Sequence, residues 1–204
     1  MPALRPAAVS LSLLVLAAGL LFLGCEATAP TSFEGASHPA VGKSLQVIRL
    51  QGLTGDPEPV SAPDIAGKVT LINYWGPWCG YCEVEFPHLV DLVKHFGENP
   101  DFKFLSVSCP ANPSEGETLA DETTDFLARY KADFPTYTDA DQVSRKHLIE
   151  AGELGEYGFG YPTTLVLDRT GTIRGLWVGY ESGYESQMRR VLDQELAKET
   201  APGQ

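Results

Sequence analysis

The sequence has few cysteines, few basic residues and, after residue 24, no long uncharged run. It contains 15 Lys and Arg against 27 Asp and Glu, which gives a formal net charge of -12 at pH 7. A protein that binds nucleic acid needs basic residues to neutralise phosphates, so this balance argues against nucleic acid as a partner. No block of like charges stands out either. The acidic excess is therefore typical of a solvated surface that keeps a domain soluble.

The length and composition set the number of domains. With 204 residues, of which 43% are apolar, the chain can bury one sizeable core but is short for two full domains. We expect one globular domain over residues 41–199, preceded by an N-terminal extension and followed by a short tail, 200–204.

The first 24 residues have the layout of an export signal. Arg5 is followed by an uncharged run, 7–24, rich in Leu, Val and Ala. Two interpretations stay open. A run of this length is at the short end of what spans a membrane, which allows an uncleaved anchor. The junction Leu21-Phe22-Leu23-Gly24-Cys25 instead resembles a bacterial lipoprotein signal, in which Cys25 carries the lipid. Both predict an extracytoplasmic domain that is held to a membrane.

The segment after this junction is small and polar, and residues 25–40 are predicted to form a flexible tether. If Cys25 carries a lipid, its sulfur is a thioether and takes no part in redox chemistry. The cysteines that remain are Cys79, Cys82 and Cys109.

From Leu45 onward, strand-like and helix-like segments alternate, which predicts a central mixed sheet with helices on both faces. The run 69–75 is β-branched, aromatic and apolar on both faces, as expected of a buried parallel strand. Strands are predicted at 45–50, near Val60, and at 69–75, 102–107, 135–138, 163–167 and 172–178; helices are predicted at 79–96, 119–130, 142–150 and 184–196.

The motif Cys79-Gly80-Tyr81-Cys82 stands where a buried strand ends and a helix begins. Free amide donors and the helix dipole at that position stabilise a thiolate, which lowers the pKa of Cys79 below its usual value of about 8.5. Cys79 is then the attacking nucleophile. Cys82, within one turn of it, can attack the resulting mixed disulfide and release the substrate.

A pair of cysteines at this spacing has other uses in proteins. A structural zinc site needs four ligands, and the sequence offers no second cysteine or histidine pair at matching spacing, so no metal is predicted. Haem attachment requires a histidine after the second cysteine, where Glu83 stands. A static structural disulfide stays open as an alternative.

Two segments carry a resemblance to a known family. Residues 75–87, Trp-Gly-Pro-Trp-Cys-Gly-Tyr-Cys-Glu-Val-Glu-Phe-Pro, resemble the active-site segment of the TlpA/ResA-like thioredoxin family, and residues 160–164, Gly-Tyr-Pro-Thr-Thr, resemble its Gly-x-Pro-Thr segment. The resemblance covers 41–198. It implies a thioredoxin-like α/β fold with an N-terminal strand pair and a central βα insertion.

The resemblance also implies residues that contact substrate. Pro162 should follow a cis peptide bond and face the two cysteines, although a trans proline before a strand is the commoner arrangement. The backbone of Tyr161 would then pair with bound substrate like an added strand. Trp78, beside Cys79 in the motif, is a further candidate contact.

Glu85 matches a glutamate that the family places near the active site and that is implicated in proton handling. A partly buried carboxylate beside two thiols could have a raised pKa and exchange protons with Cys82. A solvent-facing helix glutamate is the alternative. Asn73 stands where thioredoxin itself carries a buried acid, which leaves Glu85 as the proton relay.

Cys109 is not explained by the resemblance. It follows the strand that should neighbour the active-site strand, so its thiol could lie at the same sheet edge as Cys79 and serve as a third redox thiol. The alternative is a buried small hydrophobe.

The function implied is an extracytoplasmic thiol-disulfide oxidoreductase that acts on protein thiols and disulfides as a monomer. By resemblance it is a reductase, for apocytochrome c or other envelope substrates, that is recharged by a membrane electron donor. No metal or organic cofactor is expected besides the redox-active disulfide itself. The rival is a non-catalytic thioredoxin-fold lipoprotein that serves as a binding or metal-carrying module.

Overall fold

The computed structural model describes residues 35–112, 116–155 and 158–198, which form strands, helices and two 3-10 turns. Their bounds follow in chain order: η1 Gly35–Ser37, β1 Arg49–Thr54, β2 Val60–Ser61, η2 Ala62–Ile65, β3 Val69–Trp75, α1 Gly80–Phe96, β4 Phe102–Ser108, α2 Leu119–Tyr130, β5 Thr136–Thr138, α3 Val143–Ala151, β6 Thr163–Leu167, β7 Ile173–Val178 and α4 Tyr184–Leu196.

The strands form one mixed sheet in the order β2-β1-β5-β4-β3-β6-β7. β3 pairs in parallel with β4 and antiparallel with β6, and all seven residues of β3 are buried. A strand buried on both faces explains the continuous β-branched and apolar run that the sequence shows there. The thioredoxin-like α/β fold is confirmed, including the N-terminal strand pair β1–β2.

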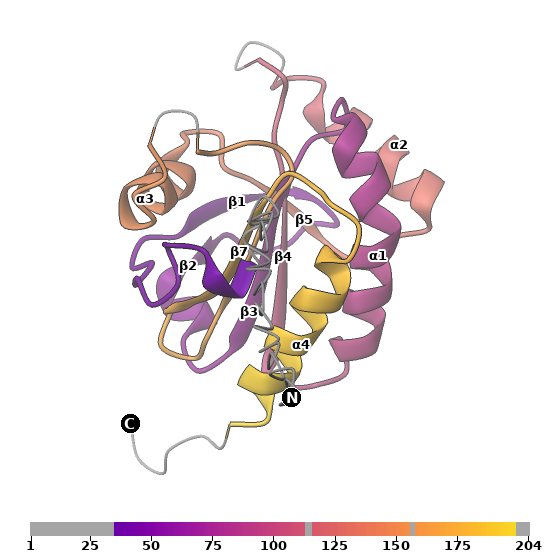
Figure 1. The fold of residues 1–204 in the computed structure, drawn as a ribbon. Coiled ribbons are helices and arrows are strands. Elements are labelled where there is room, and N and C mark those ends of the chain that lie inside the picture. The colour runs from indigo at the N-terminus through magenta and orange to yellow at the C-terminus, as the bar shows by residue number, and fades with distance from the viewer. Residues whose placement is uncertain (1–34, 113–115, 156–157, 199–204) are drawn as a thin grey trace, which may run out of the picture. The chain divides into compact units, whose positions relative to one another are not determined.

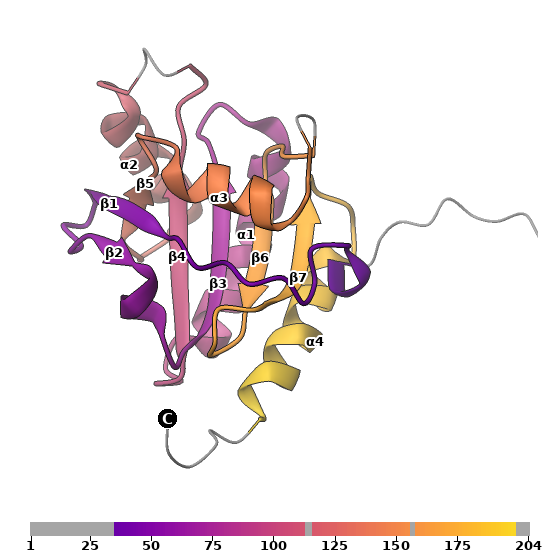
Figure 2. The ribbon, with the colours of Figure 1, turned by 90° about the vertical axis from the view of Figure 1, so that its left-hand side faces the viewer.

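Helices cover both faces of the sheet, with α1, α2 and α4 on one and α3 on the other (Figures 1 and 2). Neighbouring side chains of β3 point to opposite faces. Trp75 packs against Phe86 of α1 and Phe126 of α2, with ring centroids 4.9 and 4.6 Å away. Tyr74 is buried on the other face of the sheet, in the hydrophobic core that also contains Leu148 of α3. The sheet thereby holds α1, and the cysteines at its start, in a fixed place.

The first strand differs from its prediction. The run 45–50 was expected to be the strand, but β1 begins at Arg49. Leu45 is buried, yet its backbone N–H donates to the carbonyl of Gly171 at the β6–β7 turn, 2.9 Å away. Pairing with β5 starts only at Gln51, so residues 45–48 are not part of the strand. Their apolar side chains are buried because this segment packs over the sheet.

The predicted tether is also too long at its C-terminal end. The N–H of Gly35 donates to Oε1 of Gln187 on α4 at 3.1 Å, and Ala40 is fully buried. A Cβ on Gly35 would lie 2.0 Å from the Trp177 ring, so only glycine allows this close approach. The packed domain therefore includes residues 35–40, because small side chains fit against the sheet and α4.

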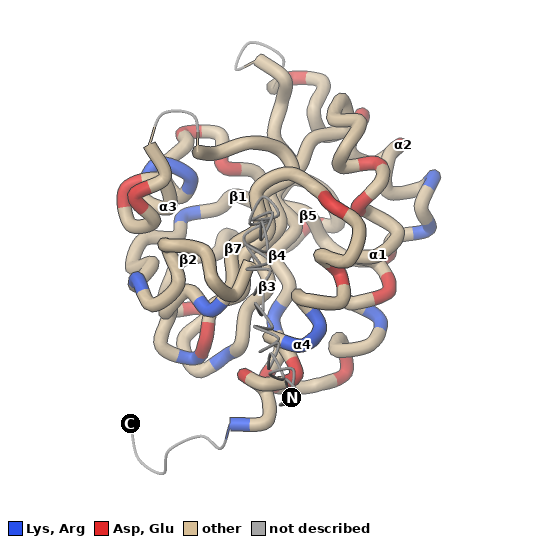
Figure 3. The backbone as a smooth tube through the Cα atoms, viewed as in Figure 1, with Lys and Arg blue, Asp and Glu red and all other residues tan. Residues whose placement is uncertain are grey.

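Several expectations lie outside the described residues: the signal sequence 1–24, Cys25, the first part of the tether, and the tail 200–204. Within the described ranges, no helix is long and apolar enough to cross a membrane. Figure 3 shows Lys and Arg scattered among Asp and Glu over the described part of the chain, without a continuous basic stripe.

Candidate active site

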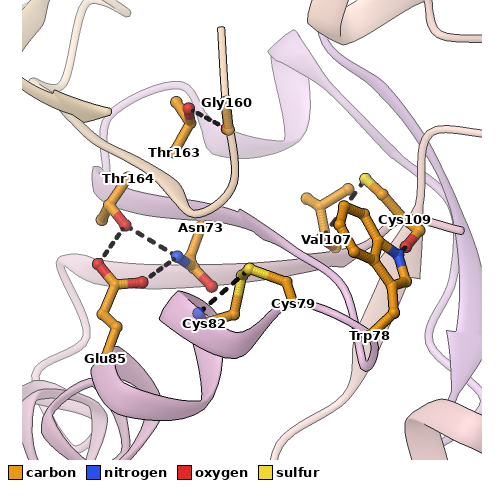
Figure 4. Close-up of a disulfide and its surroundings, with 10 residues drawn as sticks. All are labelled: Asn73, Trp78, Cys79, Cys82, Glu85, Val107, Cys109, Gly160, Thr163 and Thr164. Carbon is orange, nitrogen blue, oxygen red and sulfur yellow. Dashed lines mark hydrogen bonds between the residues drawn. A yellow bond between two sulfur atoms is a disulfide. The ribbon is translucent and has the colours of Figure 1, made fainter. Parts of the chain in front are cut away.

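The two cysteines stand at the junction of β3 and α1, where they form a disulfide. Cys79 is the N-cap of α1, and its Sγ accepts a hydrogen bond from the N–H of Cys82 at 3.1 Å (Figure 4). That N–H is one of the free donors of the helix start, so it is placed to stabilise negative charge on Cys79 after reduction. Cys79 is 5% exposed and Cys82 is 1% exposed. An incoming group therefore reaches Cys79 first.

Exposed apolar side chains lie next to the two cysteines in the sequence. Trp78, Tyr81 and Val84 are 46%, 67% and 55% exposed. The indole N–H of Trp78 donates to the carbonyl oxygen of Cys109 at 2.9 Å, which fixes the ring at the edge of the sheet. An exposed apolar rim around a reactive group is typical of a surface that contacts another chain.

The proline segment is brought beside this rim. The Tyr161-Pro162 bond is cis, as expected, and the ring of Tyr161 contacts that of Trp78 edge-on with centroids 5.3 Å apart. The Tyr161 hydroxyl accepts a hydrogen bond from Nη1 of Arg145 at 2.6 Å. Arg145, from α3, was not predicted, because no local pattern links a helix arginine to a residue 16 positions later.

Glu85 is 2% exposed, so the solvent-facing alternative is wrong. Its Oε2 accepts a hydrogen bond from Nδ2 of Asn73 at 2.9 Å, and its Oε1 accepts one from Oγ1 of Thr164 at 3.0 Å. Asn73 Nδ2 also donates to Thr164 Oγ1 at 2.8 Å. Side chains from α1, β3 and β6 thus close a triangle of hydrogen bonds, which Figure 4 shows next to the disulfide.

This environment sets the charge of Glu85. Burial raises the pKa of Glu85 to about 7, although the hydrogen bonds from Thr164 and Asn73 act in the opposite direction. Near neutral pH the carboxyl can therefore take up or give away a proton. Thr164 was not predicted as part of the site. Thr164 belongs to the site because it lies directly opposite Asn73 in the β3–β6 pair. That position could be predicted only if the register of the two strands were known.

Cys109 lies at the same sheet edge as the disulfide, since its N–H donates to the carbonyl of Trp75 at 2.8 Å. Its thiol is a free, buried group near the carbonyl of Val107 (Figure 4). Burial raises the pKa of Cys109 to about 11, which keeps the thiol protonated and poorly nucleophilic at neutral pH. These surroundings favour the buried small hydrophobe over the third redox thiol.

The metal-carrying alternative requires a cluster of side chains that can bind a metal ion. Among the described residues, 35–112, 116–155 and 158–198, no group of three or more His, Cys, Asp or Glu residues lies close enough together to hold a metal ion.

Comparison with known proteins gives consistent matches. A family model described as Redoxin matches residues 40–192. The thioredoxin-like protein YneN of Bacillus subtilis is 27% identical over 152 residues, which cover 74% of this chain and 79% of YneN. The thiol-disulfide oxidoreductase ResA of Geobacillus kaustophilus is 30% identical over 150 residues, covering 72% of this chain and 74% of ResA.

Solved structures show the same fold. A putative thiol:disulfide interchange protein DsbE from Chlorobium tepidum superposes with a TM-score of 0.59 at 22% identity, covering 77% of this chain and 98% of that one. A putative thioredoxin from Neisseria meningitidis gives a TM-score of 0.57 at 26% identity, covering 76% and 90%.

The raised pKa of Glu85 makes a prediction about stability. A carboxyl that ionises near pH 7 when folded, but near 4.5 when unfolded, binds more protons in the folded state between these values. Its contribution to stability is fully present below pH 4.5 and is lost as the pH rises through 7. The free energy of unfolding of the oxidised protein should therefore decrease over this window, by about 3 kcal/mol from this group.

Urea unfolding from pH 4 to pH 8 measures this loss, and Glu85→Gln is the matched control because it keeps the size of the side chain and cannot ionise. The difference in stability between the two proteins should change with pH over this window. Parallel pH profiles would show that Glu85 has an ordinary pKa.

Proposed function

This chain belongs to the Redoxin family and is a thiol-disulfide oxidoreductase, and from that premise we propose that it reduces disulfides in protein substrates outside the cytoplasm. The observation that carries the proposal is the pairing of Cys79 and Cys82 at the start of α1, recessed behind an exposed apolar rim. We further propose that a membrane tether near Cys25 holds the domain at the outer side of a membrane.

The arrangement supports a two-step exchange. The Cys79 thiolate attacks one sulfur of a substrate disulfide, and the other substrate sulfur leaves as a thiolate that takes up a proton. Cys82 then loses its proton and attacks the Cys79 sulfur in the mixed disulfide, which releases the second substrate thiol. The substrate gains two electrons and two protons, and the protein returns to the Cys79–Cys82 disulfide.

The buried carboxylate of Glu85 supports the reducing direction. Negative charge near the sulfurs makes a thiolate less favourable, and so does the burial of both cysteines. Both effects destabilise the reduced form relative to the disulfide, which lowers the reduction potential. A protein with a low potential gives its electrons away and must be recharged, here by a dithiol or other donor at the membrane.

The cis-proline segment supports an extended protein substrate. Among the described residues, the main-chain N–H and C=O groups of Tyr161 have no backbone partner. A substrate strand that lies across Trp78 could pair with these groups, so that its cysteine meets Cys79. The exposed ring of Tyr81 extends the apolar surface for side chains next to that cysteine.

Relatives named as thiol-disulfide oxidoreductases support catalysis over the non-catalytic binding module. For the physiological process, we propose cytochrome c maturation or thiol homeostasis in the cell envelope. A monomer suffices for the mechanism, since each group it uses comes from one chain.

Insulin reduction by residues 32–204, the compact unit of the chain, tests the activity. Cys79→Ser should abolish turnover because it removes the nucleophile. Cys82→Ser should also abolish turnover, but it should leave Cys79 in a stable mixed disulfide with the substrate, visible by mass spectrometry.

Cys109→Ala is the matched control and should reduce insulin at the wild-type rate, because the Cys109 thiol is buried and protonated. If Cys109→Ala lost its turnover, Cys109 would be a third redox thiol after all. An unmodified, inert Cys82→Ser variant would instead favour the binding-module alternative.

The membrane tether is tested on the full-length chain. If Cys25 carries a lipid, labelled palmitate should be incorporated into the wild-type protein and not into Cys25→Ser. Membrane association without any label in either protein would favour the uncleaved anchor.

A further inference from the structure

One polar atom beside the disulfide has no hydrogen-bond partner in the part of the chain that the structure describes. Asn73 is fully buried, and both of its hydrogen bonds use Nδ2, toward Glu85 and Thr164. Its Oδ1 is buried, and no described residue donates a hydrogen bond to it. Figure 4 shows the carboxamide between the Glu85 carboxylate and the disulfide, with its oxygen on the side of the two sulfurs. A buried, unpartnered acceptor is costly and is rare in folded proteins.

The orientation of this amide follows from its partners. An ionised carboxylate can only accept, and the Thr164 hydroxyl already donates its proton to Glu85 Oε1. The group that faces both oxygens must therefore be the NH2 of Asn73, which leaves the oxygen on the opposite side. Ser106, opposite Asn73 on β4, is bonded to Trp75 and Thr136 instead.

Cys82 is the group that can satisfy the free oxygen. Cys82 and Glu85 are three residues apart on α1, so their side chains share one face of the helix. That face lies against β3, since Glu85 contacts Asn73 and both Cys82 and Glu85 are buried. In the disulfide the Cys82 sulfur has no proton to donate, whereas after reduction it is a thiol and can donate one.

We propose that Asn73 is a positioning residue that decides where the proton shared by Cys82 and Glu85 resides. In the reduced protein its oxygen accepts a hydrogen bond from the Cys82 thiol, while its NH2 holds Glu85 as a carboxylate. The proton therefore stays on Cys82, and Cys79 is left as the thiolate. The inference rests on the proposed function and deepens it, since it names the side chain that makes the two cysteines unequal.

The same side chain can favour the opposite state. When Cys79 is in a mixed disulfide with a substrate, Cys82 must lose its proton before it attacks, and Glu85 is the acceptor. Rotation of the amide by half a turn would then place Oδ1 toward the protonated carboxyl and the NH2 toward the Cys82 thiolate. The Cys82–Cys79 bond forms, the Cys79–substrate bond breaks, and the proton on Glu85 passes to the departing substrate thiolate or to water.

Few charged groups compete with this pair. The hydrogen-bond partners of Glu85 from β3 and β6 are the neutral Asn73 and Thr164. From the segment between β7 and α4, Tyr180 couples electrostatically to Glu85: burial raises the pKa of Tyr180, and the charges of Glu185 and Glu85 add to that shift. Tyr180 is thus neutral at the pH values where Glu85 titrates.

The test follows Glu85 and Cys82 separately by carbon-13 NMR titration of the purified full-length chain in detergent. Asn73→Leu removes both hydrogen bonds at similar size. Glu85 should then keep its proton to a higher pH in the oxidised protein, and Cys82 should lose its proton at a lower pH in the reduced protein. Each shift should be about one pH unit, a tenfold change in proton binding. Asn73→Ala, which is smaller, should shift both groups in the same directions if the leucine variant does not fold.

Two further variants separate a direct contact from a structural effect. Thr164→Val removes the donor to Glu85 and one acceptor of the Asn73 NH2 group, but it leaves the bond from Asn73 to Glu85 and the Asn73 oxygen in place. Glu85 should therefore shift upward, while Cys82 shifts much less than in Asn73→Leu. Asn73→Asp keeps an oxygen that can accept from the Cys82 thiol. Cys82 should therefore lose its proton at a higher pH, opposite to the shift in the leucine variant.

Equal Cys82 shifts in Asn73→Leu and Thr164→Val would overturn the proposal, because the effect would then pass through Glu85 alone. These titrations do not require turnover. Insulin reduction measured on the same samples therefore distinguishes a failure of this inference from a failure of the proposed function.

Discussion

The site depends on a carboxyl group buried inside a triangle of hydrogen bonds. Glu85, Asn73 and Thr164 come from α1, β3 and β6, so the triangle joins the helix that carries the cysteines to the centre of the sheet. Burying an ionised carboxylate without partners would cost several kcal/mol. Two hydrogen bonds offset part of that cost, and the remainder appears as a pKa raised to about 7. The protein thus holds a proton that it can exchange beside its disulfide at neutral pH.

The fold places the other parts of the chemistry around this triangle. Because β3 is buried on both faces and ends where α1 begins, the disulfide is fixed at the carboxyl edge of the sheet. The helix start supplies an N–H donor to Cys79, while Cys82 lies deeper, on the side of Glu85. The two sulfurs therefore have different surroundings, which supports the proposal that Cys79 is the nucleophile and that Cys82 carries the proton. Trp78 is exposed and the backbone of Tyr161 has no backbone partner among the described residues, so these are the groups that we propose for contact with a substrate chain.

Much of this could be predicted from local patterns. The buried run 69–75, the helix that starts at the first cysteine, and the amphipathic helix 119–130 were predicted with nearly the observed bounds, because apolar spacing records which faces are buried. The cis bond before Pro162 was expected from the resemblance and is present. The N-terminal boundaries were wrong, because small residues such as Gly35 pack tightly without an apolar pattern.

The side-chain contacts between neighbouring strands could not be predicted from the sequence. Asn73 and Thr164 are 91 positions apart and meet only through the β3–β6 register. Arg145 reaches Tyr161 through the packing of α3, and the burial of Cys109 depends on segments remote in the chain. Such contacts require the whole topology, since neither residue type nor local spacing encodes them.

The most direct test of the account is the reduction potential of the Cys79–Cys82 pair at pH 5 and pH 8, in the wild-type protein and in Glu85→Gln. At pH 8 the carboxylate is charged and disfavours the reduced form, so Glu85→Gln should raise the potential by about 30 mV, equivalent to about 1.4 kcal/mol for two electrons. At pH 5 Glu85 is protonated, and the two potentials should agree. Equal potentials at both pH values would contradict a redox role for the buried carboxylate.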